Sequence, residues 1–225
     1  KTAVNRAPEA KIFTAPKTEI LSLTLPDGTS LVLNKGSKLK VAPDFGKHTR
    51  TVNLDGEAWF DVAKNPSLPF RILCGNEEFI VRGTTFNIVS YSSDNFSVVT
   101  LHSGSLEAHV KDDMLLLDPG DELRIDDEED NISRRKVDVS NSTTWMNDGA
   151  LHFSSLPLKY VAAQIGHKYD VKIRVHSSIS NIVYDGDIDN EPLDVALRLL
   201  AITAPVKLSI TNLDGEYYIT KHNNL

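Results

Sequence analysis

The sequence predicts an all-β N-terminal domain, built as a two-sheet sandwich or a short irregular β-solenoid, followed by a small α+β domain with two βαβ repeats. Three observations support this fold class. Short runs of alternating apolar and polar residues continue from residue 18 to residue 138, separated by glycine turns. No amphipathic helical pattern competes with them before residue 140. The last 75 residues then use one helix-and-strand pattern twice.

Residues 1–17 predict an extended tether before the first domain. The segment contains two Ala-Pro pairs and almost no hydrophobic periodicity. Each proline biases the residue before it away from helix, and no apolar face is available to pack.

Residues 18–138 predict the all-β domain. Leu21, Leu23 and Leu25 share one face of a strand, "PDGT" at 26–29 forms a turn, and "SLVLN" returns in phase as the second strand of a hairpin. The same alternation recurs over 50–63, 79–91, 98–110 and 115–126. Glycines separate these runs at irregular intervals, which excludes a strict solenoid repeat.

Residues 139–150 lack a clear period and predict a linker, in which Trp145 fills the junction between the domains. Residues 151–225 predict the βαβ-repeat domain. Pro157 and Pro192 each open a helical stripe of apolar residues, and an alternating strand follows each stripe at the same offset of 35 residues. We expect the two helices to cover one face of a small sheet that a last strand at 216–220 completes.

The composition excludes several classes of function. The net charge of the 225 residues is −7, which is unfavourable for binding nucleic acid or an anionic membrane surface. The single cysteine, Cys74, lies in an apolar run and predicts a buried thiol rather than a disulfide or a metal ligand. No run of about 18 apolar residues predicts a membrane span.

No pattern predicts an enzyme, and we expect no catalytic residue, no cofactor and no metal. His102 and His109 flank a turn, and the serines beside His102 lack the strand-to-helix setting of a nucleophile elbow. The acidic run at 126–130 lacks the ligand spacing of a calcium loop and predicts a solvated turn. The acidic residues at 185–189 precede a helix and favour a turn over a metal site.

The order of the motifs resembles that of a known family. "LPDGTSLVLNKGSKL", "VNLDGEAWFDVAKNPSLPFRI", "VRGTTFNIVSY", "LHSGSLEAHV" and "LDPGDELRI" follow one another as in the periplasmic region of FecR-family anti-sigma factors, above all those of Bacteroidetes. The likeness continues through residues 143–175 and 184–210. In the family this second part is similar to the short N-terminal domain of secretins and TonB-dependent transporters.

The resemblance implies a sensor without enzymatic activity. Family members cross the inner membrane once, hold an extracytoplasmic-function sigma factor through a cytoplasmic segment, and receive a signal from the N-terminal signalling domain of an outer-membrane TonB-dependent transporter. Engagement of the transporter leads to cleavage of the regulator. The resemblance covers the periplasmic portion, so we expect the membrane helix and the sigma-binding segment to precede Lys1. It implies no nucleic acid and no small-molecule substrate as partners.

The transporter's domain would bind the second domain either by adding a strand to a sheet edge or by docking on a helix face, and two segments are candidates for the edge. They are "YDGDI" and the last strand, and the candidate residues are Tyr184, Asp185, Gly186, Asp187, Ile188, Tyr217, Tyr218 and Ile219.

Two other functions stay open at this point. Trp59 and Trp145 would stack on sugar rings in a carbohydrate-binding β-protein of the periplasm or cell surface, although Trp59 has no aromatic neighbour in phase along its strand. The chain would otherwise be a purely structural β-domain with a packed appendage.

Overall fold

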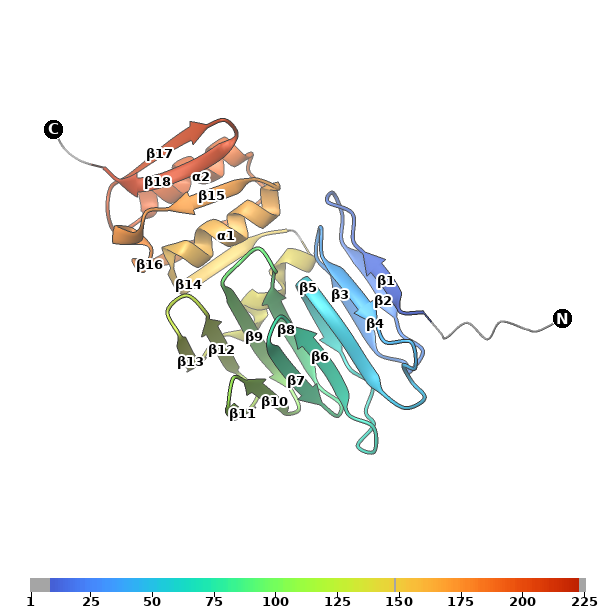
Figure 1. Cartoon of the computed structure of the whole chain (residues 1–225). Helices are drawn as coiled ribbons and strands as arrows, with labels where there is room; N and C mark the ends of the chain where they lie inside the picture. The colour runs from blue at the N-terminus through green and yellow to red at the C-terminus, as the bar shows by residue number, and fades with distance from the viewer. Residues whose placement is uncertain (1–8, 148, 223–225) are drawn as a thin grey trace. The chain divides into compact units, whose positions relative to one another are not determined.

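The structure is a computed structural model that describes residues 9–147 and 149–222 (Figure 1). The chain divides between Val139 and Ser140 into two compact units. Unit 1 is all-β and unit 2 is α+β, which confirms the predicted fold class.

The strands of unit 1 belong to one large curled sheet. They are β1 (Lys11–Thr14), β2 (Leu21–Thr24), β3 (Ser30–Leu33), β4 (Lys38–Val41), β5 (Arg50–Asp61), β6 (Phe70–Cys74), β7 (Glu77–Val81), β8 (Thr85–Ser90), β9 (Phe96–Ser103), β10 (Leu106–Val110), β11 (Asp113–Leu117), β12 (Asp121–Asp126) and β13 (Asn131–Lys136). Strand β5 is shared by two halves of the sheet. Its first half pairs with β4 and β6, and its second half pairs with β3 and β8.

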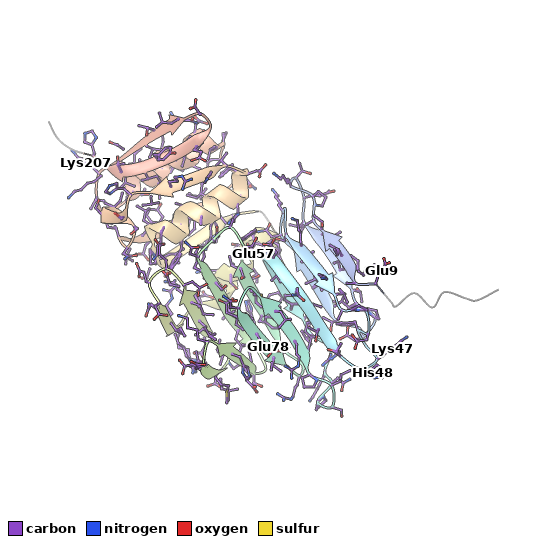
Figure 2. The ribbon with its side chains drawn as sticks, in the orientation of Figure 1. Glu9, Lys47, His48, Glu57, Glu78 and Lys207 are labelled. Carbon is purple, nitrogen blue, oxygen red and sulfur yellow. The ribbon has the colours of Figure 1, made fainter. Side chains whose placement is uncertain are left out.

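Gly56 is the residue at which β5 passes from one half of the sheet to the other. Its φ is +133°, and a Cβ at this position would lie 2.7 Å from the Cα of Ser37. Only glycine allows this close approach of two backbones. The next residue, Glu57 (labelled in Figure 2), accepts hydrogen bonds from Asn34 Nδ2 at 2.7 Å and from Asn87 Nδ2 at 2.9 Å. These bonds hold β3, β5 and β8 together beside the crossing.

The inward side chains of both halves form one hydrophobic core. Leu33, Phe60, Ile72, Phe86 and Leu101 are fully buried, and the rings of Phe60 and Phe86 stack with their centroids 5.1 Å apart. The alternation that predicted the strands therefore marks the buried face. The two halves enclose their core as the sheets of a sandwich do, but β5 joins them into one sheet.

The predicted tether is wrong for part of its length. Residues 11–14 form β1, which pairs with β4 in antiparallel register from Lys11 opposite Val41 to Thr14 opposite Lys38. The four-residue strand is too short to show a periodicity, so the sequence predicted an unpaired chain. Residues 1–8 of the predicted tether lie outside the described residues.

Unit 2 contains two small sheets with two helices between them (Figure 1). Its elements are β14 (Leu151–Pro157), α1 (Leu158–Tyr169), β15 (Lys172–Val175), β16 (Val183–Ile188), α2 (Leu193–Thr203), β17 (Leu208–Leu213) and β18 (Glu216–Lys221), with short 3-10 helices at Val139–Met146 and Ser177–Ile179. The predicted linker thus contains a 3-10 helix, in which Trp145 is buried and donates from Nε1 to the Ser142 carbonyl at 3.0 Å.

The two predicted repeats are present, but they do not share one sheet. The strands that precede the helices pair with each other, β14 with β16, and the strands that follow the helices, β15 and β17, both pair with β18. Helix α1 contacts β14 and β15, while α2 contacts β16 and β17. The helices are therefore covered on two sides, and the prediction that they cover one face of a single sheet is wrong.

Candidate functional site

Strand β16, which contains the first candidate segment, forms one edge of its sheet. Among the described residues it pairs only with β14, so the backbone groups along its other edge have no strand partner. Tyr184 and Ile188 point inward and are buried, with exposed fractions of 1% and 0%. Asp185 and Asp187 alternate with them and are exposed. This edge therefore presents an acidic outer face above a buried apolar one.

Hydrogen bonds to β14 fix both exposed acids. The carboxylate of Asp185 accepts from the backbone N–H of Ser155 at 2.7 Å, and the carboxylate of Asp187 lies 2.7 Å from Nδ1 of His152. Ser155 has a φ of +48° and lies where the register of β14 against β16 shifts. The side chains on the acidic face are thus oriented before any partner binds.

Strand β18, which contains the second candidate segment, is not an edge. It pairs in parallel with β15 and antiparallel with β17, so both sides of its backbone are already occupied. Tyr217, Tyr218 and Ile219 therefore cannot take an added strand, and this part of the prediction is wrong. The sequence analysis predicted an edge here because the last strand of a chain has no later strand to pair with. The hairpin of β17 and β18 instead inserts the final strand beside β15.

Strand β15 is an edge that the sequence analysis missed. Lys172 and Arg174 are exposed on its outer face, and each pairs with Glu216 of β18 at 3.0 Å. Hydrogen bonds from Arg174, Lys172 and Tyr218 lower the pKa of Glu216 to about 2, so the carboxylate is ionised at neutral pH. The sequence pattern that indicates this edge is "KIRV", because charged residues that alternate with apolar ones are typical of a protected edge strand.

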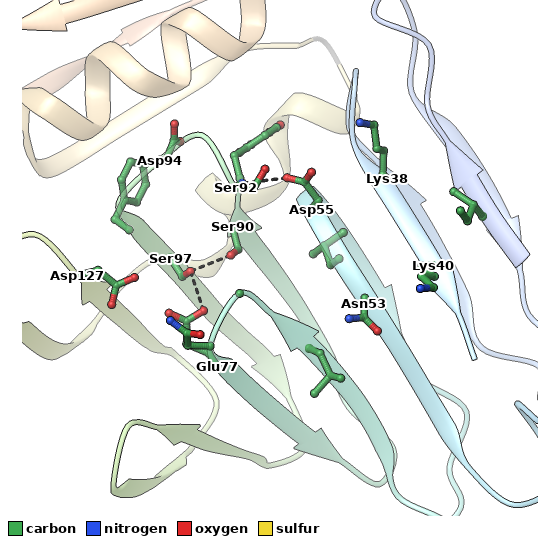
Figure 3. A pocket seen from close by; sticks show the side chains of 17 residues that line it. Lys38, Lys40, Asn53, Asp55, Glu77, Ser90, Ser92, Asp94, Ser97 and Asp127 are labelled. Atoms are coloured by element: carbon green, nitrogen blue, oxygen red, sulfur yellow. Dashed lines mark hydrogen bonds between the residues drawn. The ribbon is translucent and has the colours of Figure 1, made fainter. Parts of the chain in front are cut away.

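Unit 1 contains a cavity of about 470 Å³ near the point where β5 crosses between the halves of the sheet (Figure 3). Its lining comes from β1, β4, β5, the β6–β7 turn and the strand residues beside it, the β8–β9 loop and the strand residues beside it, and the turn after β12. The charged residues in the lining are Lys38, Lys40, Asp55, Glu77, Asp94 and Asp127. A volume of this size suits a small molecule or a few residues of peptide.

Glu77 is the most buried acid of this cavity, with an exposed fraction of 5%. Ser97 Oγ donates to its carboxylate at 3.2 Å and lies 2.9 Å from Ser90 Oγ. Burial, and then the nearby charge of Asp127, raises the pKa of Glu77. Cys74 of β6 lies directly opposite Glu77 across the strand pair. Burial raises the pKa of its thiol, so it is the buried cysteine that the sequence predicted.

The acids of the cavity were not predicted as a group. They come from positions 55, 77, 94 and 127, and only the curl of the sheet brings them together. The acidic run at 126–130 was predicted to be a solvated turn. Residues 127–130 are exposed, but Asp126 is buried with an exposed fraction of 3%, because it still belongs to β12.

The tryptophans do not form a platform for sugars. Trp145 is buried, and Trp59 is half-buried with its ring edge-on to His102 at a centroid distance of 4.4 Å. Burial lowers the pKa of His102. The partner of Trp59 comes from β9, two strands away in the sheet, which is why alternation along one strand did not show it.

Within residues 9–147 and 149–222, no group of three or more His, Cys, Asp or Glu residues could hold a metal ion. Over the same residues, no helix has both the length and the apolar character that crossing a membrane requires.

Comparisons with known proteins agree with the division into two units. The family model described as FecR protein matches residues 10–107, and the one described as FecR, C-terminal, matches residues 150–217. The first match lies in unit 1 and the second in unit 2. No curated protein matches the chain.

Two solved structures share the fold over nearly the whole chain. Both are crystal structures of proteins assigned as anti-sigma factors from Parabacteroides distasonis ATCC 8503, at 2.50 and 1.65 Å resolution. Each is 22% identical to this chain with a TM-score of 0.83. The matches cover 96% and 95% of this chain and 100% of the solved chains.

Proposed function

The chain belongs to the FecR family of anti-sigma factors, and from this premise we propose that it is the periplasmic sensor part of a transmembrane anti-sigma factor. Unit 2 would bind the N-terminal signalling domain of an outer-membrane TonB-dependent transporter. The signal would then pass to an extracytoplasmic-function sigma factor held by a cytoplasmic segment of the anti-sigma factor.

The open edge of β16 is the observation that supports this proposal. An unpaired strand edge offers backbone donors and acceptors that an added strand can use, at about 0.5–1.5 kcal/mol for each hydrogen bond. Buried Tyr184 and Ile188 anchor the strand, while exposed Asp185 and Asp187 face outward. The acidic face would select a partner strand with basic side chains.

The other open edges of unit 2 are less suited to this role. Strand β14 is irregular at Ser155, where its register against β16 shifts. Strand β15 has four residues against six in β16, and its exposed cations are already paired with Glu216. Strand β17 presents Leu213, which is 60% exposed, but no charged residue on the strand itself. We therefore place the contact at Val183–Ile188.

Hydrogen exchange with and without the purified signalling domain of the paired transporter tests this placement. We expect slower exchange of the backbone amides in Val183–Ile188 on binding. Slower exchange at Lys172–Val175 instead would contradict the choice of β16. Protection confined to residues before 140 would contradict a sensor role for unit 2 altogether.

A charge reversal at the edge sharpens the test. Asp187→Lys should weaken binding of the signalling domain about tenfold or more, because it places a cation opposite basic partner side chains. The matched control is Asp194→Lys, which makes the same charge change at an exposed position of α2. If both variants lost the same affinity for the signalling domain, the cause would be the change in net charge and not a contact at β16.

The relay can be tested in cells that express the complete anti-sigma factor and a reporter gene under the control of its sigma factor. Deletion of residues 150–225 should leave the target genes unresponsive to the inducing nutrient. An unchanged response would mean that unit 2 is not the receiver.

A further inference from the structure

Helix α2 has a second apolar stripe beside the one that it buries. The buried residues of the helix are Ala196, Leu197 and Leu200. A second set, spaced as i, i+4 and i+7, shares the adjacent flank and consists of Val195, Leu199 and Ile202, which we call the α2 stripe. The first two are half-buried, and Ile202 is 79% exposed, more than any other large apolar side chain in the described part of the chain. A helix with apolar residues beyond its buried face is typical of a contact surface.

Packing within unit 2 does not require this stripe. The two halves of the unit repeat at an offset of 35 residues, so each position of α2 has an equivalent in α1. The equivalents of Leu199 and Ile202 are Gln164 and His167, which are polar. Both helices bury one stripe between the same two sheets, yet only α2 has an apolar flank as well.

The α2 stripe lies beside the open edge of β16. Helix α1 contacts β14 and α2 contacts β16, so the free edge of β16, which points away from β14, lies on the α2 side. The hydroxyl of Tyr184 lies 2.8 Å from Thr203 Oγ1 of α2. Thr203 follows Leu199 by one helical turn and donates to its carbonyl at 2.7 Å. The flank of α2 that contains Leu199 is therefore the one turned toward β16.

The stripe and the strand run alongside each other. Four residues join the end of β16 to the start of α2, and the last residue of α2 bonds to Tyr184 near the start of β16, so the two elements are antiparallel. From Val195 to Ile202 the helix rises about 10 Å, and from Tyr184 to Ile188 the strand extends about 13 Å. A strand added at this edge would lie along most of the stripe.

The geometry of this edge favours two kinds of side chain in one added strand. Side chains of a strand alternate between the two faces of its sheet, and residues opposite each other share a face. Every second side chain of an added strand would lie beside exposed Asp185 and Asp187, and the others would point toward the α2 stripe. The first set is favoured when it is basic, because the neighbouring groups are carboxylates. The second set is favoured when it is apolar.

We propose that the edge of β16 and the α2 stripe form one site for a β-strand in which basic and apolar residues alternate. The inference rests on the proposed function for the place of the contact and adds the kind of strand that binds there. Backbone hydrogen bonds hold the added strand, Asp185 and Asp187 select its basic residues, and the stripe selects its apolar ones. A helix would contact the stripe but would leave the backbone edge of β16 unpaired.

Two peptides with blocked ends and the six-residue length of β16 separate the pattern from the composition. In one peptide lysine and valine alternate, and in the other all the lysines precede all the valines. Titration of the full chain, followed by NMR of backbone amides and side-chain methyl groups, should show the alternating peptide binding at least about fivefold more tightly. The shifted signals should belong to the amides of Val183–Ile188 and to the methyl groups of the α2 stripe.

Substitutions in the stripe locate the apolar contact. Ile202→Ser should weaken the alternating peptide about fivefold, and Leu199→Gln, which introduces the residue type of the equivalent position in α1, should do the same. Serine and isoleucine have similar helix propensities, so Ile202→Ser keeps the helix. The matched control is Leu213→Ser, since Leu213 is 60% exposed in the same unit but lies on β17. This control should change the affinity less than about twofold.

Two results would overturn the proposal. One is equal affinity for the two peptides, which includes no measurable binding of either at about 10 mM. The other is an equal effect of Ile202→Ser and Leu213→Ser on the alternating peptide.

The signalling domain of the transporter, titrated with the same variants, separates this inference from the proposed function. If the domain is weakened by Asp187→Lys but unaffected by Ile202→Ser, the contact at β16 stands and the α2 stripe is no part of it. If the domain does not bind while the alternating peptide does, the site for a strand stands and the proposed partner is wrong.

Discussion

The two units of this chain differ in the share of their strands that lie at a sheet edge. In the described part of unit 1, four strands of the thirteen-stranded sheet have a single partner, namely β1, β2, β11 and β13. In unit 2, four of five strands have a single partner, and only β18 is paired on both sides. Unpaired edges favour contacts with other chains, while paired ones favour stability. The comparison supports the roles proposed above, with unit 1 as the scaffold and unit 2 as the contact surface.

The units also differ in what stabilises them. Unit 1 has a large continuous core and a buried ion pair, whereas unit 2 distributes its apolar residues over two helices between two small sheets. The two tryptophans make the comparison measurable, since Trp59 lies in unit 1 and Trp145 in unit 2. With Trp145→Phe as the background, fluorescence follows the unfolding of unit 1 alone.

Arg50→Met should give the largest effect, confined to unit 1. The guanidinium of Arg50 is 1% exposed, pairs with Asp27 at 3.0 Å, and donates to the carbonyls of Leu68 and Ala63 at 2.7 and 2.8 Å. Its removal leaves the Asp27 carboxylate and the carbonyls without this donor. The free energy of unfolding of unit 1 should fall by about 3–5 kcal/mol.

Urea unfolding followed by Trp59 fluorescence measures this loss. The control is Arg71→Met, which removes an exposed arginine from an ion pair with Glu78 and should cost less than about 1 kcal/mol. Equal effects of the two substitutions would mean that burial of Arg50 contributes nothing.

Gly56→Ala should be the second largest change, because it acts at the crossing of β5. A Cβ would lie 2.7 Å from the backbone of Ser37, and the φ of +133° is unfavourable for any other residue. Strain and overpacking together should cost about 3 kcal/mol. Gly36→Ala is the matched control. Its φ is +71°, but its Cβ would meet no atom within 4 Å, so it should cost about 1 kcal/mol.

A cost of Gly56→Ala no larger than that of Gly36→Ala would show that the halves of the sheet can separate at the crossing. The scaffold role of unit 1 would then lose its main support, since β5 is the strand that joins the two halves.

Much of this architecture could be predicted from the sequence, and the reasons are local. Alternation of Leu21, Leu23 and Leu25, or of Val171, Ile173 and Val175, follows from one buried face, and the 35-residue repeat follows from two similar halves. What could not be predicted depends on pairing between distant segments. The central place of β18, the strand at 11–14 and the separate sheets of unit 2 leave no local signal.

The candidate sites divide in the same way. Asp185 and Asp187 are recognisable from alternation within one strand, and the structure places them on an open edge. The cavity acids Asp55, Glu77 and Asp127 belong to three separate segments, and no spacing between them indicates a site. Their grouping depends on the crossing of β5 at Gly56.

Asp121→Asn should have an effect of intermediate size that depends on pH. Burial alone raises the pKa of Asp121, but the Asp118 N–H, Arg134 and Lys136 outweigh it and hold the pKa at about 2, below its ordinary value of 3.8. A lowered pKa stabilises the fold above pH 4, and this contribution is lost as the pH falls from about 4 through about 2.

The contribution amounts to at most about 2 kcal/mol, because Arg134 and Lys136 are 42% and 64% exposed and solvent screens them. The free energy of unfolding of unit 1, measured at pH 7 and at pH 2.5, checks this contribution. The wild-type protein should lose this part of its stability on acidification, and Asp121→Asn should not. Asp118→Asn, which changes a 71% exposed acid of the same cluster, is the control and should retain most of the wild-type loss.

The smallest effect is expected in unit 2, from Tyr184→Phe. Tyr184 is buried in β16, and its hydroxyl lies 2.8 Å from Thr203 Oγ1 of α2. Thr203 donates its own proton to the Leu199 carbonyl at 2.7 Å, so the tyrosine is the donor of this bond. Loss of this hydrogen bond should lower the free energy of unfolding of unit 2 by about 1 kcal/mol. Trp145 fluorescence during urea unfolding, in a Trp59→Phe background, measures the change.

The control for this substitution is Tyr217→Phe in β18. Within the described residues the hydroxyl of Tyr217 has no hydrogen bond, so its loss should change stability by less than about 0.5 kcal/mol. If Tyr184→Phe were as neutral as the control, the bond to α2 would not hold β16 in place. The open edge would then be a mobile strand, and its acidic face could not be considered oriented before the partner binds.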